Sequence, residues 1–395
     1  MARKLFLKSG CEKLRSGHPW VYRDADVRAL GGVPMAAVID VHDAADRAFI
    51  GRGLYDADSA IAIRLFTWND DQPVDLDLVQ RRLCSAFALR ERFLDLGHTT
   101  AYRLVNGEGD DLPGLVIDRY QAFAVVQPYS AVWLPWLRDI AEITCQSLGL
   151  RGAVLKNRIR QVQDAVRRAN LEGLLHGEPI PDSLVIQEHA LAFVAAVGAG
   201  QKTGLFLDQR DNRLATARLC RDQRVLNLFA YTGGFSIHAA AHGARSVTSV
   251  DVARGCEPYA LQNLQLNQLD AARHEFIVAD AFAYLARHSG AAFDVVILDP
   301  PTFATTKKQV FTATKGYERL IEAAARVTRA SGVLVCCSCT AQVGAALFME
   351  IAARATARAG RSYRLLEVRG LPHDHPTRAA LPESRYLKCL IGVLE

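Results

Sequence analysis

The stretch Asn227-Leu-Phe-Ala-Tyr-Thr-Gly-Gly-Phe-Ser236 decides the fold that this sequence predicts. It continues the apolar run 225–229, whose length and composition are typical of a buried strand. Gly233 and Gly234 follow and open a helical pattern over residues 234–242. Because glycine has no Cβ, the backbone at these two positions can approach a ligand closely. Glycines often only turn a chain, so the stretch alone is a weak indication of a binding loop.

Strand-like and helical patterns alternate from Leu191 onward. Runs typical of strands lie at residues 225–229, 246–250, 275–278, 294–298 and 332–337, and helical runs lie near 234–242, 253–267, 281–288 and 315–330. This alternation predicts an α/β, Rossmann-like domain with a mostly parallel sheet and helices on both faces. Ligands of such sheets bind at the carboxyl ends of the strands. The residues that follow each strand are therefore the candidate site.

Polar residues follow three more of these strands. Asp251, 24 residues after Asn227, stands where an acid can bind both hydroxyls of a ribose. Asp280 is suited to an adenine edge, with Phe282 packing on the ring, and Asp299 begins a loop that two prolines stiffen. Each carboxylate alone could be a helix N-cap. Four features at four strand ends are hard to obtain by capping, so they predict a nucleoside-containing cofactor.

The identity of the cofactor follows partly from an absence and partly from a resemblance. The G-x-G-x-x-G fingerprint of dinucleotide-binding folds is missing after the first strand. The Asp-Pro-Pro loop after the fourth strand resembles class I S-adenosylmethionine methyltransferases that act on amino nitrogens or nucleobases. The predicted S-adenosylmethionine-binding residues are Phe229, Tyr231, Thr232, Gly233, Gly234, Asp251, Asp280, Ala281 and Asp299.

The fifth strand runs into Cys336-Cys-Ser-Cys-Thr340. Cys339 is expected just past the carboxyl end of this strand, beside the Asp299 loop. A thiol at that place is a nucleophile if its pKa is lowered. The alternative is a buried small hydrophobic residue, which suits Cys336 and Cys337 because they lie within the strand.

The composition sets the class of protein. The chain has 395 residues, 50% hydrophobic and 23% charged, which excludes a disordered chain. The net charge of +5 permits an acidic partner such as nucleic acid but does not demand one. With no apolar run of 18 residues and no paired CxxC motifs, neither a membrane span nor a zinc or other metal site is expected. Nine scattered cysteines fit a reducing cytoplasm.

Three domains are expected along the chain. Residues 1–72 are rich in short strands (37–41, 49–54 and 61–66). Residues 73–188 combine helices near 76–96 and 134–148 with strands at 114–118, 122–127 and 152–155, as in an α+β domain. Residues 189–395 form the Rossmann-like domain. Residues 151–170 carry six basic groups against Asp164, and these form either a solvated face or a phosphate-contacting stripe.

With these residues placed, the whole chain resembles one family. The family is the bacterial large-subunit ribosomal RNA (cytosine-C5)-methyltransferases that carry an N-terminal PUA domain. The matching stretches are Gly17-His-Pro-Trp-Val-Tyr22, residues 102–115, Ile117-Asp-Arg-Tyr120, Lys202-Thr-Gly-Leu-Phe-Leu-Asp-Gln-Arg-Asp-Asn-Arg213, residues 227–235, residues 299–303, Ser338-Cys-Thr340 and Asp374-His-Pro376. The chain departs from the family at Thr302, often Lys, and at Thr340, often Ser. The change at Thr302 weakens a role for this loop in supplying positive charge to RNA.

The resemblance implies a three-part architecture and a substrate. A PUA domain (1–72) and a middle domain (73–188) would grip ribosomal RNA, and residues 189–395 would carry the chemistry. Residues 191–213 would form a hairpin that leads into this domain. Within that segment, Lys202, Gln209, Arg210 and Arg213 either form surface salt bridges or line the entrance for cofactor or RNA.

The implied reaction uses a covalent bond to the base. Carbon 5 of cytosine is a poor nucleophile, and addition of a thiolate to carbon 6 makes it carbanion-like. Cys339 is the candidate thiolate. Asp299 is expected to bind near N3 and the amino group of cytosine, where it stabilises the charge that builds on addition. The base that removes the carbon 5 proton stays open among Asp299, a water and, as a weaker candidate, His375.

Other functions remain as alternatives. A guanine-N7 ribosomal RNA methyltransferase would need no cysteine nucleophile, and Ser338-Cys-Thr340 argues against it. A dinucleotide-dependent dehydrogenase lacks its glycine fingerprint. The complete set of strand-end residues argues against a non-catalytic RNA-binding scaffold. The sequence leaves the oligomeric state open, a homodimer included.

Overall fold

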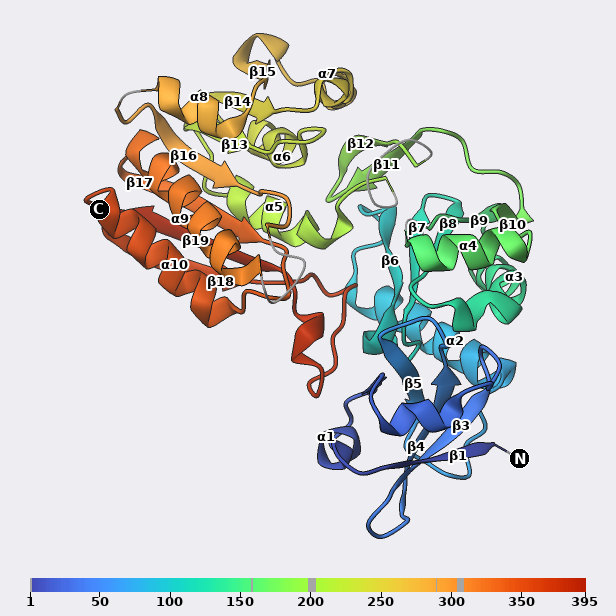
Figure 1. Cartoon of the computed structure of the whole chain (residues 1–395). Helices are drawn as coiled ribbons and strands as arrows, with labels where there is room; N and C mark the ends of the chain where they lie inside the picture. Colours follow the sequence, from blue (N-terminus) through green and yellow to red (C-terminus); the bar gives the residue numbers. More distant parts are fainter. Residues whose placement is uncertain (1, 158, 198–203, 289, 304–308) are drawn as a thin grey trace. The chain divides into compact units, whose positions relative to one another are not determined.

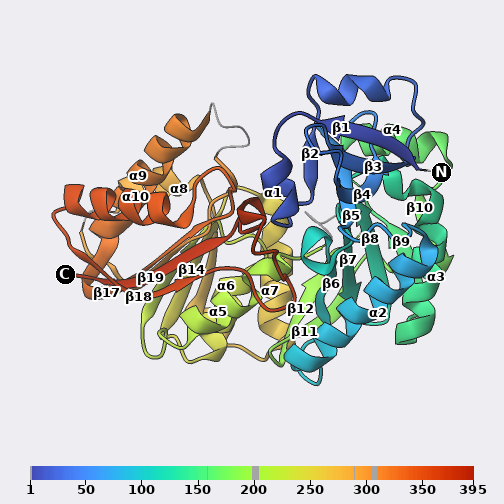
Figure 2. The same ribbon diagram turned by 90° about the horizontal axis from the view of Figure 1, so that it is seen from below.

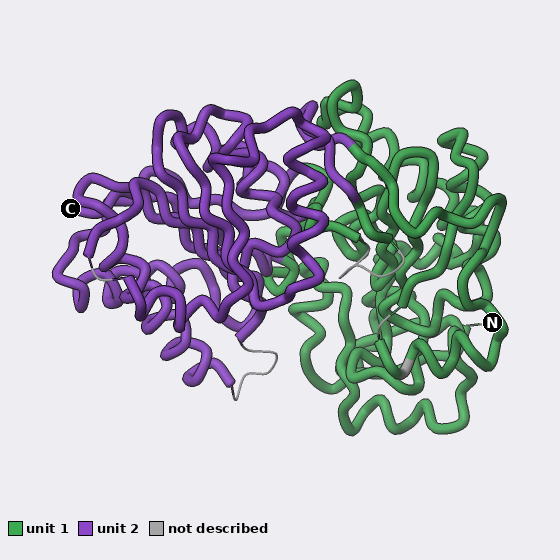
Figure 3. The backbone as a smooth tube through the Cα atoms, turned by 90° about the horizontal axis from the view of Figure 1, so that it is seen from above, with its two compact units in different colours: residues 1–186, 195–207, 373–384 green, residues 187–194, 208–372, 385–395 purple. Residues whose placement is uncertain are grey.

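In a computed structural model the chain forms two compact units (Figures 1 and 3). The structure describes residues 2–157, 159–197, 204–288, 290–303 and 309–395. Unit 1 comprises residues 1–186, 195–207 and 373–384, and unit 2 comprises residues 187–194, 208–372 and 385–395. The domain boundaries expected at residues 72/73 and 188/189 stay a prediction, since residues 1–186 lie within one compact unit.

The first sheet of unit 1 has five strands in the order β1-β3-β4-β5-β2. Its elements are β1 (Arg3–Leu7), α1 (Cys11–Arg15), β2 (Trp20–Tyr22), β3 (Val38–Asp43), β4 (Phe49–Tyr55) and β5 (Ile61–Thr67). Three of these strands match the predicted runs. The sequence pattern missed β1, which pairs in parallel with β3, and β2, which is a three-residue edge strand. Both are too short for a clear alternation of apolar and polar residues.

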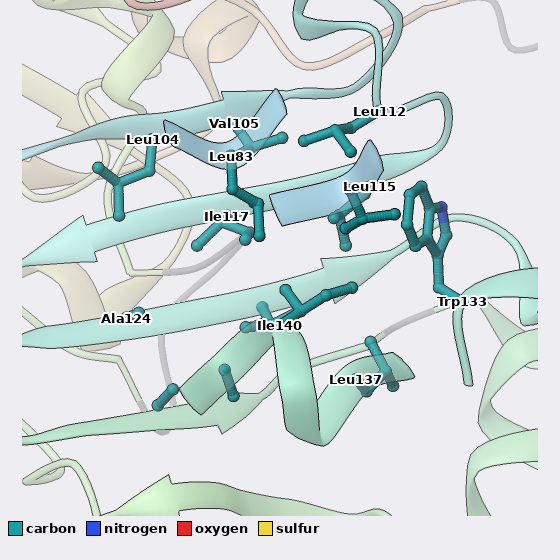
Figure 4. Close-up of a cluster of buried hydrophobic side chains, with 14 of the residues drawn as sticks. Leu83, Leu104, Val105, Leu112, Leu115, Ile117, Ala124, Trp133, Leu137 and Ile140 are labelled. Carbon is teal, nitrogen blue, oxygen red and sulfur yellow. The ribbon is translucent and has the colours of Figure 1, made fainter. Parts of the chain in front are cut away.

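The second sheet of unit 1 follows the order β10-β9-β8-β7-β6. Its elements are α2 (Leu76–Phe93), β6 (Ala101–Asn106), β7 (Leu115–Tyr120), β8 (Phe123–Pro128), α3 (Leu137–Leu148), β9 (Gly152–Leu155), α4 (Arg160–Arg168) and β10 (Gly173–Gly177). Leu83 of α2 and Ile140 of α3 pack with Ile117 of β7 in one buried cluster (Figure 4). Apolar residues at helical spacing therefore do face a sheet, as the pattern over residues 76–96 predicts.

A hairpin and a helix precede the large sheet. The hairpin is formed by β11 (Leu184–Glu188) and β12 (Leu191–Ala195), and α5 spans Arg210–Ala217. The hairpin expected over residues 191–213 is therefore wrong, because its second half is helical. His189 and Ala190 both adopt positive φ (50° and 67°), as a two-residue hairpin turn requires. Neither residue type signals such a turn, so the sequence pattern missed it.

Seven strands form the sheet of unit 2, in the order β15-β14-β13-β16-β17-β19-β18. The strands are β13 (Arg224–Leu228), β14 (Ser246–Asp251), β15 (His274–Val278), β16 (Phe293–Leu298), β17 (Thr328–Ser338), β18 (Tyr363–Arg369) and β19 (Lys388–Leu394). The first five pair in parallel, whereas β19 is antiparallel to both β17 and β18. The predicted α/β class with a mostly parallel sheet is confirmed.

Helices cover both faces of this sheet (Figure 2). They are α6 (Gly234–Ala241), α7 (Glu257–Leu266), α8 (Ala281–Arg287), α9 (Val310–Val327) and α10 (Ala345–Arg358). Leu226 and Leu228 belong to the core under α8, α9 and α10, whereas Val225 belongs to the core under α5 and α6. Successive strand residues are thus buried on opposite faces, which explains why these strands read as continuous apolar runs.

A substitution in helix α9 tests how much this core contributes to the stability of the fold. Leu320 of α9 is fully buried, so Leu320→Ala should lower the free energy of unfolding by about 2–5 kcal/mol through lost burial and a cavity. Leu366→Ala on β18 makes the same chemical change at a side chain that is 52% exposed and should change stability little. Urea titration followed by circular dichroism compares the two variants. Equal loss of stability in both would contradict this account of the core.

Candidate functional site

The carboxyl ends of the parallel strands lie in one register. Leu228 of β13 pairs with Val250 of β14 and with Leu298 of β16, and Leu298 pairs with Cys336 of β17. Phe229, Asp251 and Asp299 therefore each follow the same row of the sheet directly. The structure thus brings the strand-end residues singled out in the sequence to one edge.

The loop after β13 has a strained backbone. Phe229 and Tyr231 adopt positive φ (61° and 51°), a conformation that residues other than glycine rarely take. Gly233 adopts a φ of 84°, and its N–H donates to the carbonyl of Ala230 (2.9 Å) before α6 begins. Strain of this kind persists where the surroundings impose it, which is typical of ligand-binding loops.

Two buried polar atoms, one at the end of β13 and one in this loop, lack a partner among the described residues. They are the Thr232 hydroxyl oxygen and the Asn227 side-chain carbonyl oxygen. The other side-chain atom of Asn227, its Nδ2, donates to Ser236 (2.9 Å), and Asn263 donates to the backbone carbonyl of Thr232 (3.0 Å). Because an unpaired buried polar atom costs about 1–3 kcal/mol, these two acceptors fit a site for a polar ligand.

Asp251 links β14 to the glycine loop. Its Oδ2 accepts the N–H of Tyr231 (2.8 Å), and its Oδ1 accepts the N–H of Ala253 (2.8 Å). The side chain is half-buried. A carboxylate oxygen can accept more than one hydrogen bond, so this side chain can hold the loop and still take ribose hydroxyls.

Asp280 caps the helix that follows it. Its Oδ1 accepts the N–H of Ala283 (2.9 Å) at the start of α8, and the side chain is exposed. The capping alternative is thus realised for one oxygen, and adenine binding by the other stays a prediction. Ala281, the first residue of α8, is buried. Arg319 of α9 lies 5.4 Å from the ring centre of Phe282, so a cation covers part of the ring expected to pack on adenine.

A chain of buried amides orients Asp299. Gln209 donates from Nε2 to Asp299 Oδ1 (2.9 Å), and Asn212 donates to Gln209 Oε1 (2.7 Å). Arg369 of β18 in turn donates to Asn212 (3.1 Å). Gln209 is 2% exposed, so it does not belong to a surface salt bridge. Of the two roles left open for Gln209 from the sequence, its contact with Asp299 favours the one that lines the site, and the contact itself was not expected.

Arg213 belongs to a buried ionic cluster below the glycine loop. Its guanidinium donates to both carboxylate oxygens of Glu188, and His238 lies 2.9 Å from Glu188 Oε1. Burial alone would raise the pKa of Glu188, but Arg213 and His238 hold this pKa well below its usual range. A Cβ at Gly234 would stand 3.0 Å from Arg213 Cδ, so Arg213 needs glycine there. Arg210 is also buried and pairs with Asp211, and Lys202 lies outside the described residues.

Cys339 lies half-buried just past the end of β17. Its sulfur is 3.1 Å from the hydroxyl oxygen of Thr302, on the loop that follows Asp299. Tyr317 of α9 donates to the hydroxyl of Ser338 (3.0 Å), which holds the residue before the thiol. Cys336, in contrast, is fully buried, and burial raises the pKa of its thiol. It fits the small-hydrophobic interpretation.

Lys388 is a buried cation that the sequence analysis missed. It opens β19, is 3% exposed, and donates to the carbonyls of Thr340 and Tyr386 (2.8 Å for the latter). Burial lowers the pKa of Lys388 to about 8, while Cys339 opposes this shift. The signal in the sequence was a lysine directly before the apolar run 389–394.

Two expected features belong to unit 1. Asp374, beside His375, accepts the N–H of Arg103 (2.9 Å), and its carbonyl accepts from Arg90, so this motif is tied to β6 and α2. In the basic segment, Arg151 pairs with Glu178 and Arg167 with Glu172, as on a solvated face. Of the other four basic groups, Lys156 donates to the carbonyl of Val197, Arg160 and Arg168 on α4 are exposed, and Arg158 lies outside the described residues.

Metal-binding clusters and membrane spans are absent from what the structure describes. No group of three His, Cys, Asp or Glu side chains is placed to hold a metal ion in the described ranges. Likewise, none of the described helices is both long and apolar enough to cross a bilayer.

Comparisons with known proteins fit this fold. A family model described as S-adenosylmethionine-dependent methyltransferase matches residues 140–381, and a PUA-like domain model matches residues 6–68. Relatives named ribosomal RNA large subunit methyltransferase I are 36% identical over 391 residues in Escherichia coli O139:H28 and 35% identical over 390 residues in Aeromonas salmonicida. Each alignment covers 98% of both chains.

Solved structures are also similar over the whole length. SMU.776, described as a methyltransferase and complexed with SAH, has a TM-score of 0.85 at 26% identity, covering 99% of this chain and 100% of that one. A structure described as a SAM-dependent methyltransferase from Streptococcus mutans has a TM-score of 0.84 at 26% identity with the same coverage.

The seven-stranded sheet with its glycine loop, together with the two family models, defines a Rossmann-like methyltransferase with a PUA-like domain. The chain belongs to the S-adenosylmethionine-dependent methyltransferase family and, within it, to the family of the ribosomal RNA large subunit methyltransferase I proteins. It is an enzyme that uses S-adenosylmethionine. The predicted family, fold, enzyme class and cofactor are confirmed, and this assignment replaces the dehydrogenase and scaffold alternatives.

Asp251 provides a test of the cofactor site. Asp251→Asn removes one acceptor of the loop N–H groups and the charge offered to the ribose, so the Kd for S-adenosylmethionine should rise about tenfold or more. Asp270→Asn changes an exposed carboxylate with a similar capping bond, to Ala272 N, and should leave Kd unchanged. Isothermal calorimetry measures both variants. Wild-type affinity in Asp251→Asn would remove this residue from the site.

Proposed function

We propose that this enzyme methylates carbon 5 of a cytosine in large-subunit ribosomal RNA through a covalent bond to Cys339. The choice of RNA rests on relatives named ribosomal RNA large subunit methyltransferase I. The covalent step rests on one observation. A half-buried thiol lies at the same sheet edge as the glycine loop, and Thr302 of the Asp299 loop is 3.1 Å from its sulfur.

The residues at the sheet edge would hold the cofactor. The orphan acceptors Thr232 and Asn227, the strained loop and the Asp251 carboxylate fit a polar nucleoside ligand. When bound there, S-adenosylmethionine supplies an electrophilic methyl group. The Arg213 side chain occupies the space next to Gly234 that a Cβ would need. It thereby supports the backbone of the glycine loop.

Cys339 would act as the nucleophile. Its sulfur forms a bond to carbon 6 of the cytosine, and the electrons of the 5,6 double bond make carbon 5 nucleophilic. After carbon 5 has gained its methyl group, loss of the carbon 5 proton restores the double bond and expels the thiolate. Asp299, held by Gln209, would bind near N3 and the amino group and stabilise the charge that builds on addition. The base that takes the carbon 5 proton is left unassigned.

The target base must leave its stack to reach a site at the sheet edge, at a cost of a few kcal/mol. Unit 1, with its PUA-like residues 6–68, would supply this energy through contacts to the RNA backbone. A ribosomal RNA substrate agrees with the predicted cytoplasmic location, which stays a prediction, as does a homodimer.

Cys339 can be tested by replacement. Cys339→Ala should abolish release of tritium from ribosomal RNA labelled at carbon 5 of cytosine, because carbon 5 would no longer be activated. Cys84→Ala, at an exposed cysteine of α2, is the matched control and should keep wild-type activity. Full tritium release by Cys339→Ala would remove the covalent mechanism, and methylation of guanine at N7 would support the alternative enzyme.

The basic segment of α4 can be tested by salt dependence. If Arg160 and Arg168 contact phosphates, changing both to Gln should reduce the slope of log K against log salt by about 0.7 for each contact to a single strand. Arg151→Gln serves as the control, since Arg151 is already paired with Glu178. Filter binding of ribosomal RNA at several salt concentrations gives the slopes. An unchanged slope would leave these arginines as a solvated face.

A further inference from the structure

Lys388 is a buried charge that the proposed reaction has not yet used. Its side chain is almost fully buried, at the start of a strand whose remaining residues, 389–394, are uncharged. Placing an ammonium in such surroundings costs free energy unless hydrogen bonds and an opposite charge compensate it. The surroundings of Lys388 therefore indicate what the charge does.

The geometry holds the ammonium at the turn that carries Cys339. In the antiparallel register of β17 and β19, Ser338 pairs with Lys388. The Nζ of Lys388 donates to the carbonyl of Thr340. The residue before Cys339 thus lies opposite Lys388, and the residue after Cys339 accepts its hydrogen bond. The second contact of the ammonium is to the carbonyl of Tyr386 (2.8 Å).

Other charged or titratable groups near this turn are engaged elsewhere. Asp299 accepts from Gln209, and Asp208 accepts from the hydroxyl of Tyr386 (2.7 Å). Tyr317 donates to Ser338 and stays protonated, because burial raises its pKa. On the neighbouring strands, the thiols of Cys337 and Cys389 face each other in register, and Arg369 binds Asn212 and Glu367. Two backbone carbonyls account for two of the three ammonium protons of Lys388.

We propose that Lys388 is a positioning residue whose ammonium stabilises the thiolate form of Cys339 and fixes the turn on which this thiol stands. The proposal rests on the proposed role of Cys339 as nucleophile and names the cation that activates it. Thiolates are favoured next to lysine, so a fixed ammonium at this place raises the reactive fraction of the thiol at neutral pH.

The charge state of Lys388 agrees with this role. With a pKa of about 8, Lys388 is mostly a cation at pH 7 and becomes neutral as the pH rises above 8. Its electrostatic partner is Cys339, since a charge on that thiol raises the pKa of the lysine. By reciprocity, the ammonium favours a charged thiolate at Cys339, and this support is present below pH 8, where Lys388 is a cation, and lost above it.

The experiment measures the thiol itself. The full-length enzyme is alkylated with iodoacetamide at a series of pH values, and the rate at Cys339 is followed by peptide mass spectrometry, with the peptide of exposed Cys84 as internal reference. In Lys388→Met the pH midpoint for alkylation of Cys339 should rise by about one unit. In Lys388→Arg, which keeps a positive charge, this midpoint should lie close to the wild-type value. Lys315→Met, which removes an ammonium that lies over Phe311, is the matched control and should change nothing.

Outcomes separate this proposal from the proposed function. An unchanged midpoint in Lys388→Met, with S-adenosylmethionine affinity intact, overturns the role of Lys388. If the pH midpoint of alkylation of Cys339 in the wild-type enzyme lies at or above that of Cys84, the role of Lys388 is also overturned. This comparison needs no variant, so it holds even if Lys388→Met does not fold. If the midpoint shifts as expected but Cys339→Ala still methylates RNA, the role of Lys388 stands and the nucleophile fails.

Discussion

The parallel pairing of β13 with β14 on one side and β16 on the other is the constraint on which the site depends. It puts Leu228, Val250 and Leu298 in one row, so the residues after them emerge at one edge. The row holds because helices bury both faces of the sheet, and no strand can slip without moving apolar residues out of a core. The chemistry of the enzyme is therefore located by packing that takes no part in it.

Two buried polar systems convert this edge into a site. Below the glycine loop, Arg213 and Glu188 neutralise each other and fill the space that Gly234 leaves. Beside it, Gln209 fixes one oxygen of Asp299. Both systems draw on residues around position 210 that are far from the glycine loop in the chain. Buried ionic groups add little net stability, so their value here is more naturally the orientation of the loop and of the carboxylate.

The surroundings of Cys339 are likewise built by residues from separate segments of the chain. Cys339 lies on the turn held by Lys388, and its sulfur contacts Thr302 on the loop after β16. The family that the sequence resembles often has Lys at the position of Thr302. In this chain a hydroxyl lies next to the sulfur instead. The ammonium at this turn comes from Lys388 of β19, the antiparallel strand, and it donates to the carbonyl of Thr340.

The sequence by itself determined the strand–helix alternation, the parallel sheet and the residues at its carboxyl ends, because burial on both faces leaves apolar runs and because Asp251, Asp299 and Cys339 directly follow them. It also determined the family and the cofactor through motif order. Only the tertiary structure decided that residues 184–195 form the hairpin, that Gln209 reaches Asp299, and that Lys388 lies under the thiol turn. The hairpin was missed because His189 and Ala190 do not signal a turn, whereas the other two contacts join residues 90 and 48 positions apart, and local pattern carries no information about such pairs.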